Sequence, residues 1–335
     1  MLGPAVQQQQ GLTLAGFGDV KVEATCGLKT MADAINLWHL VGHGGARDVS
    51  WSAGFPSQAA AIVPLQMSGS LPDFVIIGAQ KCGTTALHAY LQRHPEISMS
   101  RPKELDYFIA EMNLSKGLDW YHDRFDPEAK VRGESSPNYT AYPRLDGVPG
   151  RMAELLPDAK LIFMVRDPID RVRAGWLHRY SNRTESRPMH EAVLDPTQSY
   201  VDRSRYHLQL TRFLEHYPID RVLLLEQDEL LNERRETLRR VYRFLGVDEE
   251  VWRESFNTPK LESAARGRRT RLGAFAAKRL SPRRWRKVRH LRVFQAPYEQ
   301  PPMTADLRAE LEDMLRDDAA AFRELTGRRF ATWSI

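Results

Sequence analysis

The stretch Phe74-Val-Ile-Ile-Gly-Ala-Gln-Lys-Cys-Gly-Thr-Thr-Ala-Leu-His-Ala-Tyr-Leu91 decides the fold of this chain. Its first four residues are apolar, which is typical of a buried strand in a parallel sheet. Thr85 to Arg93 carries apolar residues at helical spacing, so the glycine-bearing piece between the two is predicted to be a strand-to-helix turn. Such a turn directs free backbone N–H groups at an anion.

The residues of this turn suit a phosphate. Gly78 and Gly83 let the backbone curl, and Lys81 adds a positive charge. The hydroxyls of Thr84 and Thr85 stand at the helix start, where the helix dipole favours a phosphate. The glycine spacing is that of a P-loop, but Thr84 replaces the lysine that a nucleotide triphosphatase has there. The plain structural alternative is a glycine turn with a surface lysine.

A second turn of the same kind follows the apolar run Leu161–Val165, which is predicted to be another buried strand. Asp167 is placed to cap the next helix, which runs to about Tyr180, and Pro168 suits its first turn. Arg166 then stands at the carboxyl edge of the sheet, where open α/β sheets bind ligands. Taken alone, these residues describe only a capped helix start.

The two turns together resemble the donor site of sulfotransferases that use 3′-phosphoadenosine 5′-phosphosulfate (PAPS). The similarity is to relatives of the heparan sulfate N- and O-sulfotransferases, of bacterial type, and runs from about Leu71 to Trp333. In that family the first turn holds the 5′-phosphosulfate without a metal. The resemblance therefore implies a set of donor-binding residues at this turn, namely Lys81, Cys82, Gly83, Thr84 and Thr85.

The second turn resembles the family's 3′-phosphate element. There an arginine after the strand and a serine eight residues later clamp the phosphate on the ribose, which implies donor binding by Arg166. Ala174 stands at the serine position, so that hydroxyl is lost, and Arg173 is a neighbouring cation. Cys82 as a nucleophile is the less favoured alternative to a small loop residue, because no histidine stands at a recognisable partner spacing.

A candidate base lies in Lys103-Glu-Leu-Asp-Tyr-Phe108, one connection after the first turn. From the residues alone, a solvated ion pair between Lys103 and Glu104 is the favoured interpretation. The family has a Lys-Glu-x-x-Phe-Phe-like element here, so the resemblance implies that Glu104 is the catalytic base and acts with Lys81. Asp106 stands where many members carry histidine. Downstream, Gly133 to Tyr139 resembles the acceptor segment, with Ser135 in place of a lysine.

Charge is concentrated in one part of the chain. Between Ser263 and Tyr298 there are twelve Lys or Arg and no Asp or Glu, against a net charge of +5 for all 335 residues. The family has a donor-covering arginine near this point, which implies Arg268, although the register fits Arg266, Arg269 or Arg271 as well. Lys278 to Arg292 interleaves apolar residues with cations, which suits an interfacial helix near anionic lipids, an anionic acceptor, or a solvated basic face.

These patterns predict an α/β fold, with a single domain over residues 71–335 and a central, mostly parallel sheet flanked by helices. The basic helical excursion spans about 263–298, and residues 1–70 are predicted to be a flexible or weakly packed extension. Two cysteines, Cys26 and Cys82, make no disulfide framework or metal site. No run approaches eighteen apolar residues, and a secretion signal is missing, so a cytoplasmic location is expected.

The expected function is transfer of a sulfonate from PAPS, as co-substrate and without a metal, to a hydroxyl in preference to an amine. The acceptor would be a glycan, a glycolipid or another small molecule such as a secondary metabolite. One alternative is a P-loop kinase, but Leu161–Val165 ends in Arg166 instead of the Asp that would hold magnesium. The other is a nucleic-acid-binding protein, which the basic stretch suits although no nucleic-acid-binding motif accompanies it, so no nucleic-acid partner is expected.

Overall fold

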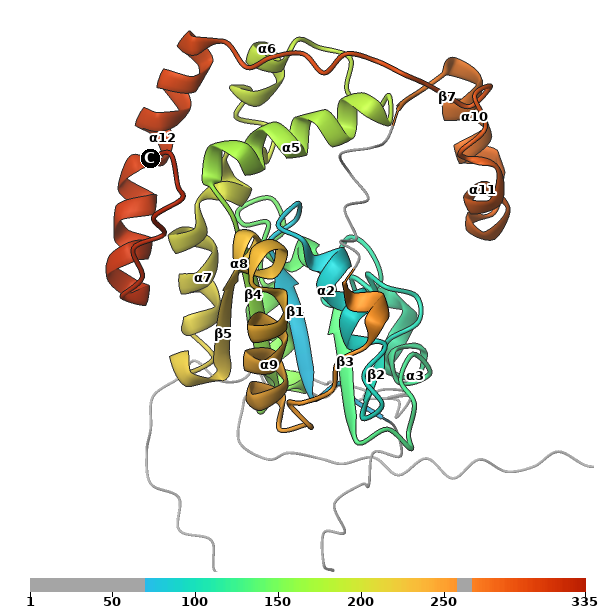
Figure 1. Ribbon diagram of the computed structural model, residues 1–335, viewed down its shortest axis with the longest axis vertical. Helices are drawn as coiled ribbons and strands as arrows, with labels where there is room; N and C mark the ends of the chain where they lie inside the picture. The colour runs from blue at the N-terminus through green and yellow to red at the C-terminus, as the bar shows by residue number, and fades with distance from the viewer. Residues whose placement is uncertain (1–69, 258–266) are drawn as a thin grey trace, which may run out of the picture. The chain divides into compact units, whose positions relative to one another are not determined.

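The computed structural model describes residues 70–257 and 267–335. Its centre is a five-stranded sheet of strand order β2-β3-β1-β4-β5, in which every neighbouring pair is parallel. Helices lie on both sides of this sheet (Figure 1), so the predicted α/β fold is confirmed. The strands are β1 (Phe74–Gly78), β2 (Ile97–Met99), β3 (Val131–Ser135), β4 (Lys160–Val165) and β5 (Val222–Glu226).

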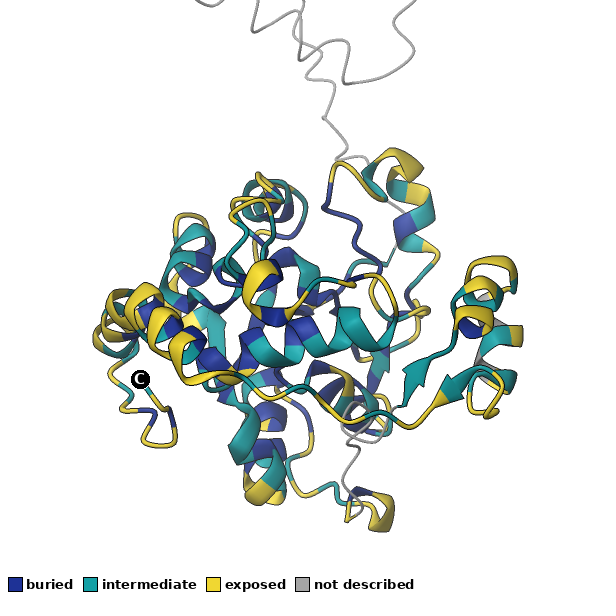
Figure 2. Cartoon of the chain, turned by 90° about the horizontal axis from the view of Figure 1, so that it is seen from above, coloured by how far each residue is buried: buried dark blue, intermediate teal, exposed yellow. Residues whose placement is uncertain are grey.

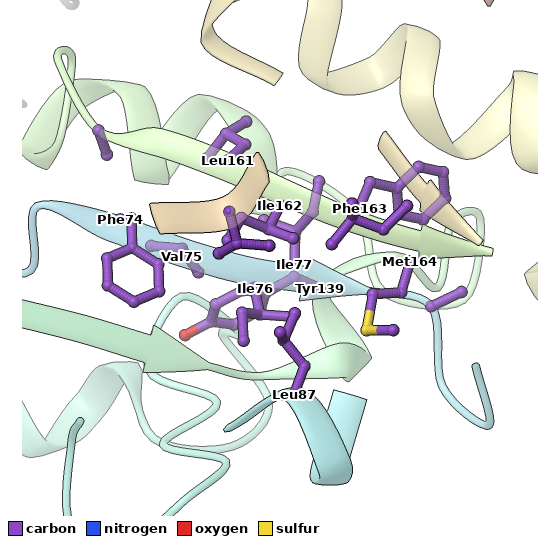
Figure 3. Close-up of a cluster of buried hydrophobic side chains, with 14 of the residues drawn as sticks. Phe74, Val75, Ile76, Ile77, Leu87, Tyr139, Leu161, Ile162, Phe163 and Met164 are labelled. Carbon is purple, nitrogen blue, oxygen red and sulfur yellow. The ribbon is translucent and has the colours of Figure 1, made fainter. Parts of the chain in front are cut away.

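The two central strands form the middle of the hydrophobic core. All of β1 is buried, as is β4 from Leu161 onward. Figure 3 shows their side chains packed together, with Leu87 of the following helix and Tyr139 beside them. Strands that are covered on both faces need apolar residues at every position, and this is why both appeared as unbroken apolar runs in the sequence.

The helices begin and end where local signals place them. The longer ones are α2 (Thr84–Leu91), α4 (Val148–Leu155), α5 (Pro168–Ser181), α7 (Tyr206–Leu214), α9 (Arg234–Leu245) and α12 (Ala305–Thr326), and the shorter ones are α3 (Gly117–His122), α6 (Met189–Val193) and α8 (Gln227–Asn232). Gly246, with φ 76°, ends α9, and Gly327, with φ 64°, ends α12. A left-handed residue after the last turn is a common helix stop, and glycine adopts it without a Cβ clash.

A second, smaller core lies where α5, α6 and α12 meet. Trp176 of α5 is buried there with Met189 of α6 and with Leu311 and Leu315 of α12. In Figure 2, buried positions alternate with intermediate ones along α5 and with exposed ones along α12. This packing holds α5 in place, and α5 carries the residues that follow Arg166.

Parallel strands bring all their carboxyl ends to one edge of the sheet. β1 lies between β3 and β4, so the chain moves to one side of β1 for β2 and β3 and to the other side for β4 and β5. Such a reversal of strand order opens a crevice at the carboxyl edge, which is where α/β proteins bind ligands. The turns after β1 and β4 therefore meet at this crevice.

The basic stretch forms a small insert, called the basic insert below (residues 267–298). It contains α10 (Arg271–Arg279) and α11 (Pro282–Val288), and it is closed by the antiparallel strands β6 (Arg268–Arg269) and β7 (Gln295–Ala296). The prediction of one helix over Lys278–Arg292 is wrong. The helix breaks because Ser281 caps a new one and Pro282 begins it.

Residues 1–69 and 258–266 lie outside the described residues. The extension predicted over residues 1–70 and the first residues of the predicted basic excursion fall there, as does Arg266. The end of the extension at residue 70 and the start of the basic excursion at about residue 263 therefore stay predictions. Among the helices of residues 70–257 and 267–335, none combines the length and the apolar character that crossing a bilayer requires.

Candidate active site

The turn after β1 has the strained geometry of a phosphate-binding loop. Gly83 caps α2 with φ 91°, a left-handed conformation that glycine adopts easily. Lys81 also has a positive φ, 76°, which is uncommon for a residue with a side chain and occurs often at functional sites. A Cβ added to Gly78 would lie 1.9 Å from Thr140 Oγ1, so glycine is required there as well. The predicted turn is thus present, with the first N–H groups of α2 at its end.

The turn after β4 has the predicted cap. The Asp170 N–H donates to Asp167 Oδ1 at 2.8 Å, and Pro168 is the first residue of α5. The Arg166 side chain is about one quarter exposed, and its Nη2 lies 3.2 Å from Asp170 Oδ2. An arginine held by an exposed carboxylate one turn along a helix can exchange that weak partner for a phosphate.

Tyr206, the first residue of α7, joins the two turns. Its buried hydroxyl accepts the Arg166 N–H at 3.4 Å and lies 3.4 Å from Cys82 Sγ. A backbone bond reinforces the link, because the Ala79 N–H donates to Met164 O at 2.7 Å. Tyr206 is therefore a buried bridge behind both turns.

One cavity of about 200 Å³ includes both turns in its lining. Lys81 comes from the first turn, and Arg166, Arg173 and Ala174 come from the second turn and α5. The family resemblance implied that these two segments bind opposite ends of one nucleotide. The full lining is Lys81, Arg166, Asp170, Arg173, Ala174, Leu177, His178, Ser181, Tyr298 and Gln300.

The other predicted residues of the first turn lie outside the described lining of this cavity. Cys82 is fully buried, and burial raises the pKa of its thiol, which stays protonated beside Tyr206. The Cys82 N–H donates to Ala79 O at 3.2 Å. Thr84 is buried at the start of α2, whereas Thr85 is exposed. The Cys82 side chain therefore has a packing role in this structure, and the thiol lacks the lowered pKa that a nucleophile needs.

Arg268 lies at the base of the basic insert, beside the cavity. Its guanidinium carbon lies 3.9 Å from the centre of the Tyr180 ring, and the Tyr180 ring lies 6.1 Å from that of Tyr298, which lines the cavity. Of the alternatives within the described residues, Arg269 stacks on Trp285 inside the insert and Arg271 is exposed. Arg268 is thus the best placed of the described candidates.

Glu104 lies outside the described lining of that cavity, on a neighbouring loop. Its N–H donates to Ser135 O at 3.0 Å, and its φ is 65°. The side chain is about half exposed and forms an ion pair with Lys103. The surface pair that the residues alone favoured is therefore present, at the carboxyl end of β3. A carboxylate on an exposed loop at the carboxyl edge of the sheet remains accessible from solvent.

The loop that carries Glu104 is held by a buried carboxyl group that sequence reasoning missed. Glu134 is fully buried, and its side chain accepts hydrogen bonds from Tyr121, from Ser136 at 2.6 Å and from Tyr139 at 2.6 Å. Burial raises its pKa, while the three hydroxyl donors counteract part of that shift. No local pattern in the sequence marked Glu134, because Val131–Ser135 is largely polar, and only its burial shows that the acid needs partners.

Two of those hydroxyls also accept hydrogen bonds from backbone N–H groups of the loop. Ser136 Oγ accepts the Asp106 N–H at 3.0 Å, and the Tyr139 hydroxyl accepts the Tyr107 N–H at 3.0 Å. The loop backbone is therefore bonded, through one hydroxyl each, to a single buried carboxyl group. Asp106 also has a positive φ, 48°, a conformation that persists only where the surroundings enforce it.

A polar bridge connects this loop to the first turn. Asn138 donates to both carboxyl oxygens of Asp106, at 3.3 and 3.2 Å, and its Oδ1 accepts from Arg203 at 3.0 Å and from Gln80 at 3.4 Å. Burial, together with the charges of Arg171 and other arginines, lowers the pKa of Arg203 to about 9. Arg203 is still cationic at neutral pH. No sequence signal marked it, because its neighbours come from three separate segments.

In residues 70–257 and 267–335, His, Cys, Asp and Glu do not gather into any group of three or more that could hold a metal ion. The described site is instead cationic, with Lys81, Arg166 and Arg173 around one cavity. Lysine and arginine donate hydrogen bonds and attract anions, so this arrangement suits a ligand with two separated phosphate groups.

Comparison with known proteins agrees with this chemistry. Residues 71–297 match the family model described as a sulfotransferase domain. The chain is 28% identical over 283 residues to bifunctional heparan sulfate N-deacetylase/N-sulfotransferase 1 of Caenorhabditis elegans, a match that covers 79% of this chain and 31% of that protein. It is 28% identical over 275 residues to human heparan sulfate glucosamine 3-O-sulfotransferase 3A1, covering 77% of this chain and 66% of that protein.

A solved structure has a similar fold. A sulfotransferase from Alicyclobacillus acidocaldarius superimposes with a TM-score of 0.59 at 24% identity, covering 79% of this chain and all of that one. The chain belongs to the sulfotransferase domain family, related to the heparan sulfate N- and 3-O-sulfotransferases. It spans less than a third of the length of the bifunctional worm enzyme and about two thirds of the human one. Family membership favours the sulfotransferase hypothesis over the kinase and nucleic-acid alternatives.

Proposed function

We propose that this protein transfers a sulfonate group from PAPS to a hydroxyl group, in preference to an amine, of a glycan, a glycolipid or a secondary metabolite. The observation that carries the proposal is the shared cavity of Lys81 and Arg166. These cations follow neighbouring strands, β1 and β4, and the start of α2 lies beside them. Two cationic turns at one edge suit a nucleotide with a phosphate at each end.

In this proposal the two turns divide the donor between them. Lys81, Gly83, Thr84 and Thr85 hold the 5′-phosphate at the start of α2, where N–H groups and the helix dipole attract an anion. The Cys82 N–H already bonds to Ala79 O, so Cys82 contributes through the loop's shape.

The second turn takes the other end of the nucleotide. Arg166 clamps the 3′-phosphate on the ribose. Arg173, on the same cavity wall as Ala174, supplies the contact for which the family uses a serine hydroxyl. Arg268 closes over the nucleotide from the base of the basic insert.

The reaction is an in-line displacement at sulfur. The acceptor oxygen forms a bond to sulfur as the bond between sulfur and the 5′-phosphate oxygen breaks, and the acceptor proton passes to Glu104. Lys81 stabilises the negative charge that builds on the leaving phosphate oxygen. As in phosphoryl transfer, positioning and charge stabilisation supply most of the acceleration. This division of roles requires no metal.

The acceptor approaches from the side of β3. Glu104 lies on that side, and the Asn138 bridge connects its loop neighbour Asp106 and Arg203 to Gln80, next to Lys81. Arg203 takes over the cationic role of the family lysine whose place Ser135 occupies. Its charge supports an acceptor that carries an anionic group near the hydroxyl.

The proposed donor site is tested by calorimetric titration with 3′-phosphoadenosine 5′-phosphate (PAP) and with adenosine 5′-phosphate. Arg166→Ala should weaken PAP binding by about tenfold or more and adenosine 5′-phosphate binding much less, because only PAP has a 3′-phosphate. The control is Arg243→Ala, an exposed arginine of α9 that is paired with Glu249.

Two results would contradict the donor assignment. The first is equal weakening of both nucleotides by Arg166→Ala, which would remove the 3′-phosphate role. The second is a wild-type protein that binds PAP no better than adenosine 5′-phosphate. A screen with labelled PAPS over neutral sugars, acidic glycans and glycolipids then identifies the acceptor. Sulfation of neutral soluble sugars alone would overturn the proposal that the acceptor carries an anionic group.

A further inference from the structure

The basic insert has a one-sided charge. It contains eleven Lys or Arg between residues 268 and 292 and no Asp or Glu. Its exposed cations come from both helices and the segment after them, namely Arg271, Lys278, Arg279, Arg284, Lys287 and Arg292. A surface with this composition attracts polyanions.

The same insert also exposes large apolar side chains. The exposed fractions are 52% for Leu272, 59% for Phe275, 44% for Leu291 and 52% for Val293. The described residues contain eight large apolar side chains that are exposed, and half of them lie in this one insert. Scattered apolar residues are normal on a protein surface, but a cluster indicates an interaction site.

Helix α10 presents these two kinds of side chain together. Gly273 is its buried residue, and a Cβ there would lie 2.1 Å from Phe294 O, so this side of the helix faces the rest of the insert. Leu272, Phe275 and Arg279 follow at helical spacing on one exposed face. The guanidinium carbon of Arg279 lies 5.4 Å from the centre of the Phe275 ring.

The second apolar pair belongs to a neighbouring segment. Thr270, which caps α10, donates through Oγ1 to Val293 O at 2.6 Å and through its N–H to Phe294 O at 3.0 Å. Leu291 and Val293 are therefore held next to the start of α10. The insert's own aromatic contact, Trp285 with Phe294 at 5.7 Å between ring centres, leaves these residues uncovered.

We propose that the basic insert docks on the surface of a bilayer that contains anionic lipids. An interfacial site needs apolar side chains that enter the headgroup region and cations that pair with lipid phosphates, and the insert exposes both on α10. A nucleic-acid site would use the cations but would leave Leu272 and Phe275 exposed without a role.

The insert joins the rest of the protein at the candidate active site. Arg268 packs on Tyr180, and the chain leaving the insert supplies Tyr298 and Gln300 to the lining of the donor cavity. A docked insert therefore holds this cavity near the lipid headgroups. The docking itself does not depend on the transfer chemistry, so it can be tested without an acceptor.

The test is co-sedimentation of the full chain with phosphatidylcholine vesicles, with and without phosphatidylglycerol. The wild-type protein should sediment with the anionic vesicles and about tenfold more weakly with the neutral ones. The double variant Leu272→Ser/Phe275→Ser should lose about tenfold in affinity for the anionic vesicles. The matched control is Met314→Ser/Leu325→Ser, which removes two exposed apolar residues of α12 and should leave vesicle binding unchanged.

Each remaining outcome would overturn the proposal. Absence of wild-type sedimentation with anionic vesicles would exclude the docking. Equal losses in the insert and control variants would show that α10 is not the docking face. Full vesicle binding by the insert variant, together with tight binding to duplex DNA that falls steeply with salt, would assign the insert to nucleic acid. PAP affinity, measured in parallel, reports on the donor site separately.

Discussion

At the scale of single residues, Lys81 and Glu104 have separate places and separate roles in the proposed reaction. Lys81 lines the donor cavity, whereas Glu104 lies on the loop at the end of β3, outside the described lining. A cation at the leaving oxygen and a base at the acceptor act on opposite sides of the transferred group, as an in-line displacement requires. Substitution of Glu104 should therefore leave nucleotide binding intact, whereas substitution of Lys81 should weaken it.

The first prediction contrasts these two residues. Glu104→Gln should lower sulfonate transfer by about a hundredfold or more while PAP affinity stays within about twofold of wild type, because the base does not touch the nucleotide. Lys81→Ala should lower transfer by a similar factor and also weaken PAP binding. Transfer assays with labelled PAPS and calorimetry with PAP measure both. A parallel fall of PAP affinity and transfer in Glu104→Gln would make that residue structural.

The second prediction concerns His88 of α2, which lies near Lys103 and Glu104. Burial, followed by the Lys103 charge, lowers its pKa from 6.5 to about 4. The folded state thus binds fewer protons than the unfolded state between these values, so stability falls as the pH drops from about 6.5 toward 4. Between pH 7 and pH 5 the contribution lost is about 2 kcal/mol.

Urea unfolding of wild type and His88→Leu at both pH values measures this contribution. Leucine is a suitable replacement, because His88 Nδ1 is buried without a hydrogen-bond partner in the described structure. The variant should lose about 2 kcal/mol less than wild type between pH 7 and pH 5. Identical losses in the two proteins would show that His88 is solvated in the folded state.

At the scale of elements, the buried Glu134 makes the end of β3 and the loop before it into one unit. The Tyr139 hydroxyl donates to Glu134 and accepts the Tyr107 N–H. It therefore connects the buried carboxyl group to the loop backbone at Tyr107. The loop conformation includes positive φ values at Glu104 and Asp106. It therefore depends on these hydroxyl bridges.

The third prediction follows from this arrangement. Tyr139→Phe should lower the free energy of unfolding by about 1–3 kcal/mol, because it leaves the carboxyl group and an N–H short of a partner. It should also lower transfer activity while PAP affinity is kept. The control is Tyr217→Phe, another buried tyrosine, whose hydroxyl donates to Leu156 O at 3.0 Å. If both variants lower transfer equally, Tyr139 acts only through stability.

The elements also show what the sequence could and could not predict. β1 and β4 were predictable because each is a local apolar run, and the turns after them follow from glycine spacing and from the Asp167 cap. β3 was not, since Val131–Ser135 includes Arg132 and Glu134 and becomes a strand only through its pairing with β1 and β2. The Glu134 cluster likewise joins residues from three segments, and no local pattern announces such a contact.

At the scale of the whole molecule, the basic insert is an addition that the sheet does not need. Its two ends pair with each other, Arg268 with Ala296 and Arg269 with Gln295, so the chain enters and leaves at one place. The antiparallel pair can be closed by a short turn. In our proposals, the turns after β1 and β4 recognise the donor and the insert docks on a surface.

The fourth prediction uses that closure. Replacing residues 271–293 by a short Gly-Asn turn should leave the melting temperature within about 3 °C of wild type and PAP affinity within about threefold, since Arg268 stays in place. Binding to anionic vesicles should disappear. Thermal unfolding, calorimetry and sedimentation measure the three quantities. Loss of folding would contradict the view that the insert is a separate addition.

The most direct measurement of the central claim is a crystal structure of the protein with PAP. The account predicts the 5′-phosphate at the start of α2, with Lys81 Nζ within about 3 Å of its oxygens, and the 3′-phosphate on the Arg166 guanidinium. PAP bound at another edge of the sheet, or with its 3′-phosphate directed away from Arg166, would contradict it.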